Sequence, residues 1–483
     1  MNISSSRRRF LQQLGLATGA LATSSIAGAQ NVIVPPNLGT GKIIVPDPNK
    51  IGPSTSFPAR AAGAKYMGGF RAPKLDKVKV AFVGVGKRGV SHVNQMAVID
   101  GAEIVGICDV YDDLAKRSAD IVEKKTGKRP ETFSGSETAY IDMMKKVKPD
   151  AVIICPSWEW HSKITCDVMK LGAHAFVEVP MAVSIKELWE IVDTSEKTQK
   201  HCMQMENCNY GREELLYLNM VRQGVIGDLL HGEAAYIHDL RSEMDEVERG
   251  TGSWRTYHYS KRNGNVYPTH GLGPVAQYMN LARKDDNFGR LVSFSSPAIG
   301  RKRHAQAKFP ADHKWNKLEF NCGDINNALI KTTMGRTILV QWDETSPRPY
   351  SRINLIQGTL GTLTGFPTRV AGLNLGDGNF HRWIEGGELN AIYDKYDHPL
   401  WKRVGDLATK MGGHGGMDYL MLYRMIECLR KGEPMDQNVY EGAFWCAVSE
   451  LTEKSVAQGG MPVVFPDFTR GDWKTTEPLG VIQ

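Results

Sequence analysis

The sequence has no Cys-x-x-Cys pair, although it contains eight cysteines, and most of these lie in apolar or mixed stretches. This pattern disfavours a disulfide framework or a zinc site and favours buried thiols, so no metal is predicted. The chain also has no internal repeat and no low-complexity tract. A repeat architecture is therefore not expected.

A strong charge of one sign is also missing. The formal net charge is +6, and only +3 remains once Arg7, Arg8 and Arg9 are removed with the first 29 residues, which contain no acid. A charge this weak and dispersed does not predict a nucleic-acid partner. A small-molecule or glycan substrate is expected instead.

The N-terminus lacks an apolar run long enough to span a membrane, which requires about 20 residues. Its segment Leu14–Ala27 is diluted by Gly, Ser and Thr, follows Ser6-Arg7-Arg8-Arg9-Phe10-Leu11 and precedes Ala27-Gly28-Ala29. A membrane anchor is the alternative, but this pattern favours a twin-arginine signal over residues 1–29. We therefore expect the twin-arginine translocase as a partner, a periplasmic or otherwise exported protein, and no stable membrane anchor.

Residues 30–75 are rich in proline, which disfavours both helix and sheet interiors. We predict an extended arm that could wrap the body or a partner subunit, so a homo-oligomer stays open. The rest of the chain is long enough for two domains, which we place at residues 76–205 and 206–483.

Strands and helices alternate in the first of these domains, which predicts a doubly wound parallel sheet of the Rossmann type. The expected strands are Val78–Val83, Glu103–Cys108, Ala151–Cys155 and Ala175–Glu178, and the expected helices cover about 88–98, 112–125, 161–171 and 184–198.

The second domain shows runs of strands with short turns, which predicts an α+β domain with a mostly antiparallel sheet. The expected elements are helices at Glu213–Arg222 and Asp418–Lys431 and strands at 229–237, 290–296, 317–322, 326–333, 336–342 and 352–357.

A glycine-rich turn follows the first strand and opens a helix, with Gly84, Gly86 and Gly89 in a Gly-x-Gly-x-x-Gly pattern. Such a turn lets the backbone approach a pyrophosphate and directs helix N-terminal amides at its charge. Asp109 ends the second strand, where its carboxylate can accept the ribose hydroxyls and would repel a 2′-phosphate. The cofactor is therefore predicted to be NAD.

Longer motifs give the chain a specific resemblance, which covers nearly everything from Lys77 to Trp473. The strings that carry it include Trp158-Glu159-Trp160-His161, Glu178-Val179-Pro180, Glu206-Asn207, Tyr236 before His238-Asp239-Leu240-Arg241, Trp254-Arg255-Thr256, Tyr267-Pro268-Thr269-His270-Gly271, Arg348-Pro349-Tyr350, Tyr393 to Pro399, and Gly413-His414-Gly415-Gly416-Met417-Asp418-Tyr419. With these strings the chain resembles the Gfo/Idh/MocA superfamily and, within it, glycoside hydrolase family 109, whose known activity is α-N-acetylgalactosaminidase.

The resemblance implies two sets of binding residues. NAD contacts are implied at Lys87, Arg88, Asp109, Trp158, Glu159, Trp160, His161, Glu178, Val179 and Asn207, besides the turn glycines. Substrate contacts are implied at Tyr236, Arg255, Tyr267, Pro268, Thr269, His270 and Tyr350. Arginine and tyrosine suit a sugar, which needs directional donors and an aromatic wall.

The candidate catalytic residues are His270, Tyr267, Tyr350 and Glu178. His270 is the expected general base because an unperturbed histidine titrates near neutrality. The predicted cycle oxidises C3 of the sugar with NAD, eliminates the C1 group, adds water and then reverses the oxidation. His270 and Tyr267 are assigned to proton movements at C3 and C2, and Tyr350 and Glu178 to the leaving group or the water.

One departure from the wider superfamily bears on the chemistry. Its dehydrogenases carry Glu-Lys-Pro where this chain has Glu178-Val179-Pro180, so the usual acid-base lysine is absent. This counts against the first alternative, an exported sugar oxidoreductase with a retained dinucleotide. The second alternative is a non-catalytic protein that binds NAD or sugar, against which Tyr267, His270 and Tyr350 argue.

Overall fold

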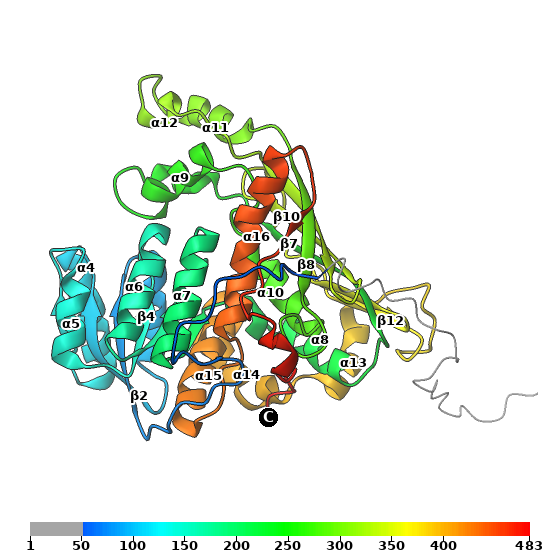
Figure 1. Ribbon diagram of the computed structural model, residues 1–483, viewed down its shortest axis with the longest axis horizontal. Coiled ribbons are helices and arrows are strands. Elements are labelled where there is room, and N and C mark those ends of the chain that lie inside the picture. The colour runs from blue at the N-terminus through cyan, green and yellow to red at the C-terminus, as the bar shows by residue number, and fades with distance from the viewer. Residues whose placement is uncertain (1–51) are drawn as a thin grey trace, which may run out of the picture. The chain divides into compact units, whose positions relative to one another are not determined.

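The computed structural model describes residues 52–483 (Figure 1). The predicted signal, residues 1–29, and residues 30–51 of the predicted arm lie outside the described residues. In the part of the chain that is described, no helix combines the length and the apolar character that crossing a membrane requires.

The first sheet contains six parallel strands in the order β3-β2-β1-β4-β5-β6. Its strands and the helices that connect them alternate along the chain, which confirms the predicted doubly wound sheet. The strands are β1 (Val78–Val83), β2 (Ala102–Cys108), β3 (Glu131–Phe133), β4 (Ala151–Ile154), β5 (His174–Val177) and β6 (Cys202–Gln204).

The helices of this half flank the sheet, and several of them appear at the left of Figure 1. Helix α6 begins at Trp158, three residues before the predicted start, so the aromatic run Trp158–Trp160 forms its first turn. The helices are α3 (Lys87–Met96), α4 (Asp112–Thr126), α5 (Ala139–Val147), α6 (Trp158–Lys170) and α7 (Ile185–Thr198).

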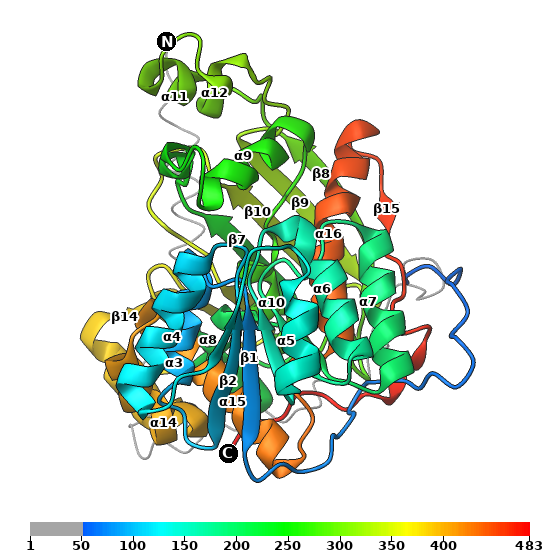
Figure 2. The same cartoon turned by 90° about the vertical axis from the view of Figure 1, so that its left-hand side faces the viewer.

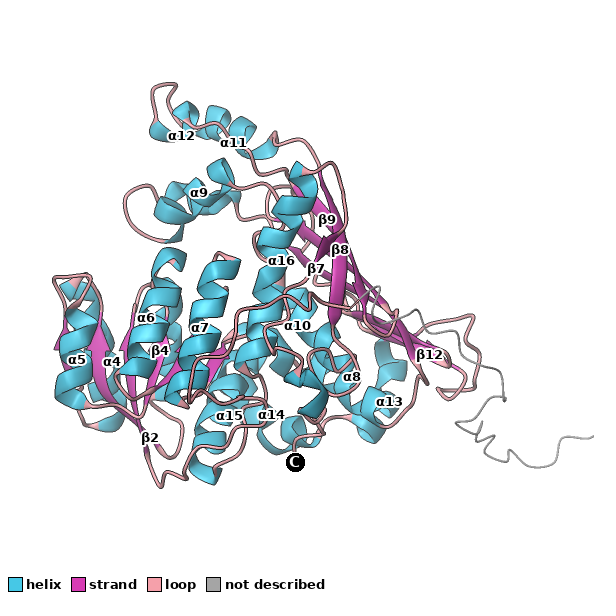
Figure 3. Ribbon diagram, in the orientation of Figure 1, coloured by secondary structure: helices cyan, strands magenta, loops and turns pink. Residues whose placement is uncertain are grey.

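The second sheet has nine strands in the order β14-β13-β12-β11-β7-β10-β9-β8-β15, drawn in magenta in Figure 3. All of its pairs are antiparallel except β7 with β10, which confirms the expected mostly antiparallel sheet. The strands are β7 (Leu229–Ile237), β8 (Phe288–Ser295), β9 (Ile325–Thr332), β10 (Thr337–Asp343), β11 (Leu355–Gly358), β12 (Gly361–Thr364), β13 (Arg369–Gly372), β14 (Ile384–Glu385) and β15 (Val463–Val464).

The predicted strand at 317–322 is wrong. A short helix, α12 (Lys314–Lys317), ends there, and the chain continues as a loop. Lys302 Nζ donates to the carbonyl oxygens of Asn316 (3.0 Å) and Leu318 (2.8 Å), so a side chain satisfies backbone groups that a strand would have paired.

Helices pack on the nine-stranded sheet, with α10 on β7 and α16 on β8 (Figure 2). Helix α16 is buried along most of its length and begins with a capping box between Asn438 and Glu441. The remaining helices are α8 (Arg212–Arg222), α9 (Thr251–Lys261), α10 (Thr269–Tyr278), α11 (Gly300–Lys308), α13 (Leu389–Tyr396), α14 (Pro399–Met411), α15 (Met417–Lys431) and α16 (Val439–Ala457).

Residues 52–75 of the predicted arm contain no helix or strand and lie on the body of the protein. Arg60 forms ion pairs with Glu196 (3.0 Å) and Asp472 (2.8 Å), and the Phe70 ring packs edge-on against His201. The arm therefore joins α7 to the C-terminal segment. All eight cysteines are unpaired, and all but the half-buried Cys155 are buried, as expected.

Candidate functional site

The glycine turn lies between β1 and α3 and has the shape that a dinucleotide requires. Gly84 has φ +82°, and a Cβ at this position would lie 2.6 Å from the carbonyl carbon of Cys155. A Cβ at Gly89 would overlap the carbonyl oxygen of Gly84. A Cβ at Gly86, in contrast, would meet no atom within 4 Å.

The open space beside Gly86 adjoins the start of α3, where no side chain caps the helix. Exposed amides at a helix N-terminus attract phosphate oxygens. The turn therefore fits the predicted NAD, because its backbone donors are available and the space that a side chain would fill is free.

Asp109 lies at the carboxyl end of β2, as predicted, and is buried. Its Oδ2 accepts a hydrogen bond from the amide of Val85 (2.8 Å), and its Oδ1 accepts one from the amide of Tyr111 (3.0 Å). Each carboxylate oxygen can accept a further bond. Asp109 thus shapes the glycine turn and still has the acceptors that a ribose would use.

Arg88, in the first turn of α3, connects three segments of the site. Its Nε donates to Glu178 Oε1 (2.7 Å), and its two terminal nitrogens donate to Asp418 Oδ2 (2.7 Å) and Oδ1 (3.0 Å). Asp418 also accepts from Asn207 Nδ2 (2.6 Å) and pairs with His414 Nδ1 (2.8 Å). The predicted cofactor residues Arg88, Glu178 and Asn207 therefore lie in one network.

Glu178 is buried at the carboxyl end of β5. Burial alone would raise the pKa of its carboxyl, but Arg88 and His92 outweigh burial and hold that pKa below its ordinary value. His92 Nε2 lies 2.6 Å from Glu178 Oε1. Glu178 is consequently a carboxylate at neutral pH, which fits the predicted role of positioning water better than the alternative role of protonating the leaving group.

Four aromatic rings from three separate segments meet beside this network. The Tyr267 ring lies 5.0 Å from Tyr236, 5.0 Å from His270 and 5.7 Å from Trp158, measured between centroids. The Arg255 guanidinium lies 4.8 Å from the centroids of both Trp158 and Tyr267. The predicted substrate residues thus form one cluster that includes the predicted cofactor residue Trp158.

His270 lies in the first turn of helix α10, directly after Pro268. Its Nδ1 is 2.7 Å from Oε1 of the buried Glu206, which follows β6. The neighbouring Thr269 hydroxyl donates to the other oxygen of Glu206 (2.6 Å). Glu206 therefore contacts two successive residues at the start of this helix.

Tyr350 lies at the rim of the cluster, 40% exposed. Its ring is 6.2 Å from Tyr236 and 5.0 Å from His238, and its hydroxyl accepts a hydrogen bond from Arg352 (2.9 Å). Burial of part of the side chain raises its pKa to about 12. His238 Nδ1 pairs with the Tyr236 hydroxyl at 3.0 Å.

The remaining predicted residues have different surroundings. His161 is buried, with its nitrogens facing the carbonyl oxygens of Pro180 and Pro156, and Trp160 packs against the main core. Lys87 pairs with Glu246 (3.3 Å) and Glu159 with His258 (3.0 Å). Val179 is buried in the apolar cluster around Trp158, and Pro268 precedes α10.

Several residues that hold this site together were not predicted from the sequence. Glu344 pairs with Arg255 (2.5 Å) and accepts a hydrogen bond from Tyr259, and Asp418 pairs with Arg88. Glu206 and Asp418 both lay in strings that carried the resemblance. Because both are acidic and stand in the same strings as predicted site residues, they could have been proposed from the sequence as partners of those residues.

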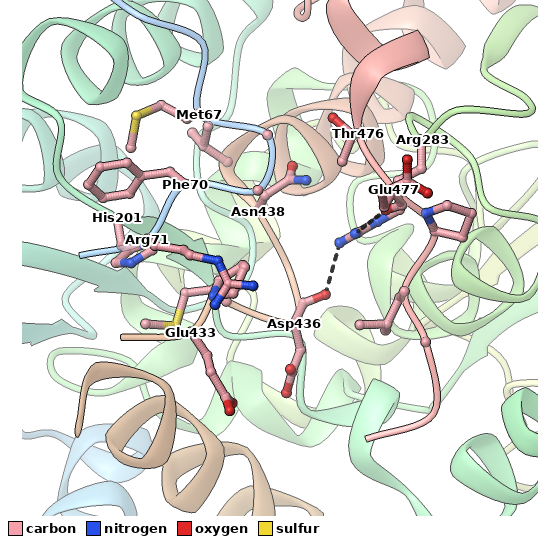
Figure 4. A pocket seen from close by; sticks show the side chains of 18 of the residues that line it. Met67, Phe70, Arg71, His201, Arg283, Glu433, Asp436, Asn438, Thr476 and Glu477 are labelled. Atoms are coloured by element: carbon pink, nitrogen blue, oxygen red, sulfur yellow. Dashed lines mark hydrogen bonds between the residues drawn. The ribbon is translucent and has the colours of Figure 1, made fainter. Parts of the chain in front are cut away.

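A separate cavity of about 670 Å³ lies under the arm, between Met67–Arg71 and the C-terminal residues Thr475–Gln483 (Figure 4). None of the predicted site residues lines it. Arg283, which lines this cavity, already has partners: it donates a hydrogen bond to the backbone carbonyl of Asp436 and forms an ion pair with Glu441. This cavity is therefore distinct from the candidate site.

Two family matches divide the chain. Residues 78–206 match "Oxidoreductase family, NAD-binding Rossmann fold", which confirms NAD as the cofactor, and residues 210–475 match "Glycosyl hydrolase 109, C-terminal domain". "Glycosyl hydrolase family 109 protein 1" of Akkermansia muciniphila is 77% identical over 100% of both chains. "Alpha-N-acetylgalactosaminidase" of Shewanella oneidensis is 49% identical over 99% of this chain and 98% of its own length.

Solved structures share the fold at low sequence identity. A levoglucosan dehydrogenase in complex with NADH and levoglucosan has a TM-score of 0.61 and 15% identity, over 81% of this chain and 100% of the other. An oxidoreductase from Agrobacterium radiobacter, in complex with NAD+, L-tartaric acid and magnesium, has a TM-score of 0.54 and 16% identity, over 80% of this chain and 98% of the other.

Proposed function

Because this chain belongs to glycosyl hydrolase family 109, as the sequence resemblance predicted, we propose that it hydrolyses α-N-acetylgalactosaminides in a cycle with no net redox change. The observation that carries the proposal is that the ring cluster around Tyr267 adjoins the network of Arg88: Val179 packs in that cluster, and the preceding residue, Glu178, is bonded to Arg88. The sugar is proposed from the Shewanella relative's name.

The carboxylates of the site support this cycle over conventional glycoside hydrolysis, which uses two carboxyl groups that flank the scissile bond. Glu178 is engaged by Arg88 and His92, Asp418 by Arg88 and His414, and Glu206 by His270. Bound NAD supplies the alternative chemistry by taking up the hydrogen and electrons of the C3–H bond and returning them when the cycle closes.

His270 moves the protons at C3 and C2, and Tyr267 holds the C3 oxygen. Burial raises the pKa of Tyr267 well above its ordinary value, so its hydroxyl stays protonated and donates a hydrogen bond to the C3 oxygen. His270 takes the C3 hydroxyl proton as the hydride leaves C3 and releases that proton to water. It then removes the C2 proton, which the neighbouring ketone acidifies, and the C1 group leaves with a proton from a separate donor. Water adds at C1 and gives its proton to that same donor, His270 returns a proton to C2, and the C3 oxygen regains its proton from water through His270 as the hydride returns.

The leaving group needs a proton donor, which we assign to His414 instead of Glu178. The His414 side chain is 61% exposed and its Nδ1 is paired with buried Asp418, so its Nε2 is accessible. Burial is the largest cause that lowers the pKa of His238 at the rim, and His414 contributes to lowering it together with Arg255 and His270. His414 therefore lies near His238. Tyr350, whose ring packs against His238, is assigned to binding the sugar.

The test uses purified protein and an aryl α-N-acetylgalactosaminide in deuterated water, without added NAD. We expect aglycone release and deuterium at C2 of the product, and His270→Ala should abolish both while NAD still copurifies. His231→Ala, on β7 and bonded to Thr337, is the matched control. Release without C2 label would overturn the elimination, and substrate oxidation without release would favour the oxidoreductase alternative.

Export through the twin-arginine translocase is also proposed, because this route carries folded proteins and NAD is a cytoplasmic cofactor. Replacing Arg7, Arg8 and Arg9 by lysine should leave the activity in the cytoplasmic fraction. An unchanged distribution between cytoplasmic and exported fractions would contradict this proposal.

A further inference from the structure

Glu206 is a fully buried carboxylate that contacts a candidate catalytic residue. It follows β6, at the carboxyl edge of the parallel sheet, and its exposed fraction is 0%. Oε1 faces His270 Nδ1 at 2.7 Å and accepts from the amide of Cys208 (3.1 Å), and Oε2 accepts from the Thr269 hydroxyl (2.6 Å). None of these three donors carries a fixed positive charge.

The position of the Glu206 side chain is fixed by the helix that carries His270. A Cβ at Gly273, one turn along α10, would lie 2.9 Å from Glu206 Cγ. The backbone carbonyl of Glu206 accepts a hydrogen bond from Gln437 (2.9 Å). The helix and the carboxylate are therefore held in one relative geometry, in which His270 contacts Oε1 of Glu206 and Thr269 contacts Oε2.

This geometry decides which nitrogen of His270 carries the proton. A carboxylate can only accept hydrogen bonds, so Nδ1 must donate, and in the neutral imidazole Nε2 then has a free lone pair. Burial alone would raise the pKa of Glu206, but His270 and Thr269 outweigh it and lower that pKa, which keeps the carboxylate ionised. Nε2 is the atom that can take a proton in the ring cluster.

From this arrangement we propose that Glu206 is a positioning residue that holds His270 in the Nδ1–H tautomer and stabilises the imidazolium formed when Nε2 takes the C2 proton. The inference rests on the proposed cycle. When Nε2 takes the C2 proton, His270 becomes a cation next to the buried Glu206 carboxylate. The attraction between these two charges partly offsets the cost of separating the proton from C2. Glu206 itself exchanges no proton with the sugar.

Other titratable groups that face His270 must be considered in any pH test. They are Tyr236 on β7, Tyr267 before α10, the thiol of Cys208 and, beyond Tyr236, His238. Burial raises the pKa of Tyr236, Tyr267 and Cys208 well above ordinary values, so these three stay neutral near pH 7.

The test compares wild type with Glu206→Gln as NAD-loaded proteins. The glutamine should keep bound NAD and lower kcat/KM by about 10²- to 10⁴-fold, as loss of a histidine-orienting carboxylate does elsewhere. The acid limb of the pH profile should move to lower pH, because the imidazolium loses its negative partner. Glu206→Asp should restore the position of this limb and only part of the rate, because the charge returns one methylene short of His270.

Gln437→Leu is the matched control, since it removes a side-chain bond to the backbone carbonyl of Glu206 without touching the carboxylate that faces His270, and it should keep the acid limb of wild type. A Glu206→Gln enzyme with wild-type rate and acid limb would overturn the proposal. Should this variant not fold, nitrogen NMR of wild type decides, because an Nε2–H tautomer of resting His270 contradicts the proposal.

The two proposals fail in different ways. If wild type places no deuterium at C2, the cycle itself is wrong, whatever Glu206 does. If wild type labels C2 and Glu206→Gln labels it equally fast with an unchanged pH profile, the cycle stands and the positioning role of Glu206 is wrong.

Discussion

Replacing Asp418 by asparagine tests the network around Arg88. Asp418 Oδ2 faces donors of Arg88 (2.7 Å) and His414 (2.8 Å), and Oδ1 faces donors of Arg88 (3.0 Å) and Asn207 (2.6 Å). Whichever way the new amide turns, its NH₂ group faces two donors. Charge-assisted hydrogen bonds contribute about 1.5–3 kcal/mol each, so two lost bonds cost about 3–6 kcal/mol.

The lower end of this range applies, because the Arg88 side chain is 29% exposed and water can replace part of what it loses. We therefore expect Asp418→Asn to reduce the free energy of unfolding by about 3 kcal/mol at pH 7. Urea unfolding of the NAD-free protein measures this loss of free energy. The control is Asp406→Asn, which replaces an exposed carboxylate on α14. A loss below about 1 kcal/mol would refute the argument that the network is stabilising.

The effect of pH follows from the charge of Asp418. Burial would raise the pKa of this carboxyl, but Arg88 and His414 outweigh burial and hold it well below its ordinary value. Stability from a depressed carboxyl pKa is present above the pKa of the unfolded chain and is lost as pH falls through the folded value. The difference between wild type and Asp418→Asn should therefore persist to about pH 4 and shrink only below it.

Two further predictions concern the turn and a pair of buried histidines. Gly89→Ala should lower the melting temperature, because the new Cβ would overlap a backbone carbonyl. Gly86→Ala should leave the melting temperature unchanged but weaken NAD binding, measured by calorimetry, at least about tenfold. Equal NAD affinity of Gly86→Ala and wild type would show that the ligand does not use this space. Burial lowers the pKa of His174 to about 3 and of His201 to about 4, so both charge on unfolding, and stability should fall from about pH 6.5 to 4. His201→Gln should flatten this fall by up to about 3 kcal/mol, unlike His381→Gln on the surface, and an unchanged slope would contradict it.

The elements with strong local patterns were predictable from sequence. The apolar strand Val78–Val83 and the glycine turn after it have the predicted bounds, because strand, turn and helix signals are local. Helix α16 was not predicted, since it is apolar nearly all round and its sequence lacks the amphipathic period that marks a surface helix.

The candidate site was predictable only in part. The resemblance identified His270, Tyr267, Tyr236 and Arg255, which the fold brings together. It did not identify the partners of these residues, because a contact such as that between Arg88 and Asp418 depends on how distant segments pack and leaves no periodic signal. The choice between the two roles predicted for Glu178 depends on such contacts too, because its partners Arg88 and His92 both come from α3.

The contacts of Arg88 restrict how this protein can evolve. Arg88 belongs to the parallel-sheet half of the chain and neutralises a buried carboxylate, Asp418, that belongs to the other half. Recombination that exchanged the nucleotide-binding half for that of a dehydrogenase without this arginine would leave Asp418 buried with no strong cation. Any exchange of one half would therefore have to keep both Arg88 and Asp418 for this buried charge to stay neutralised.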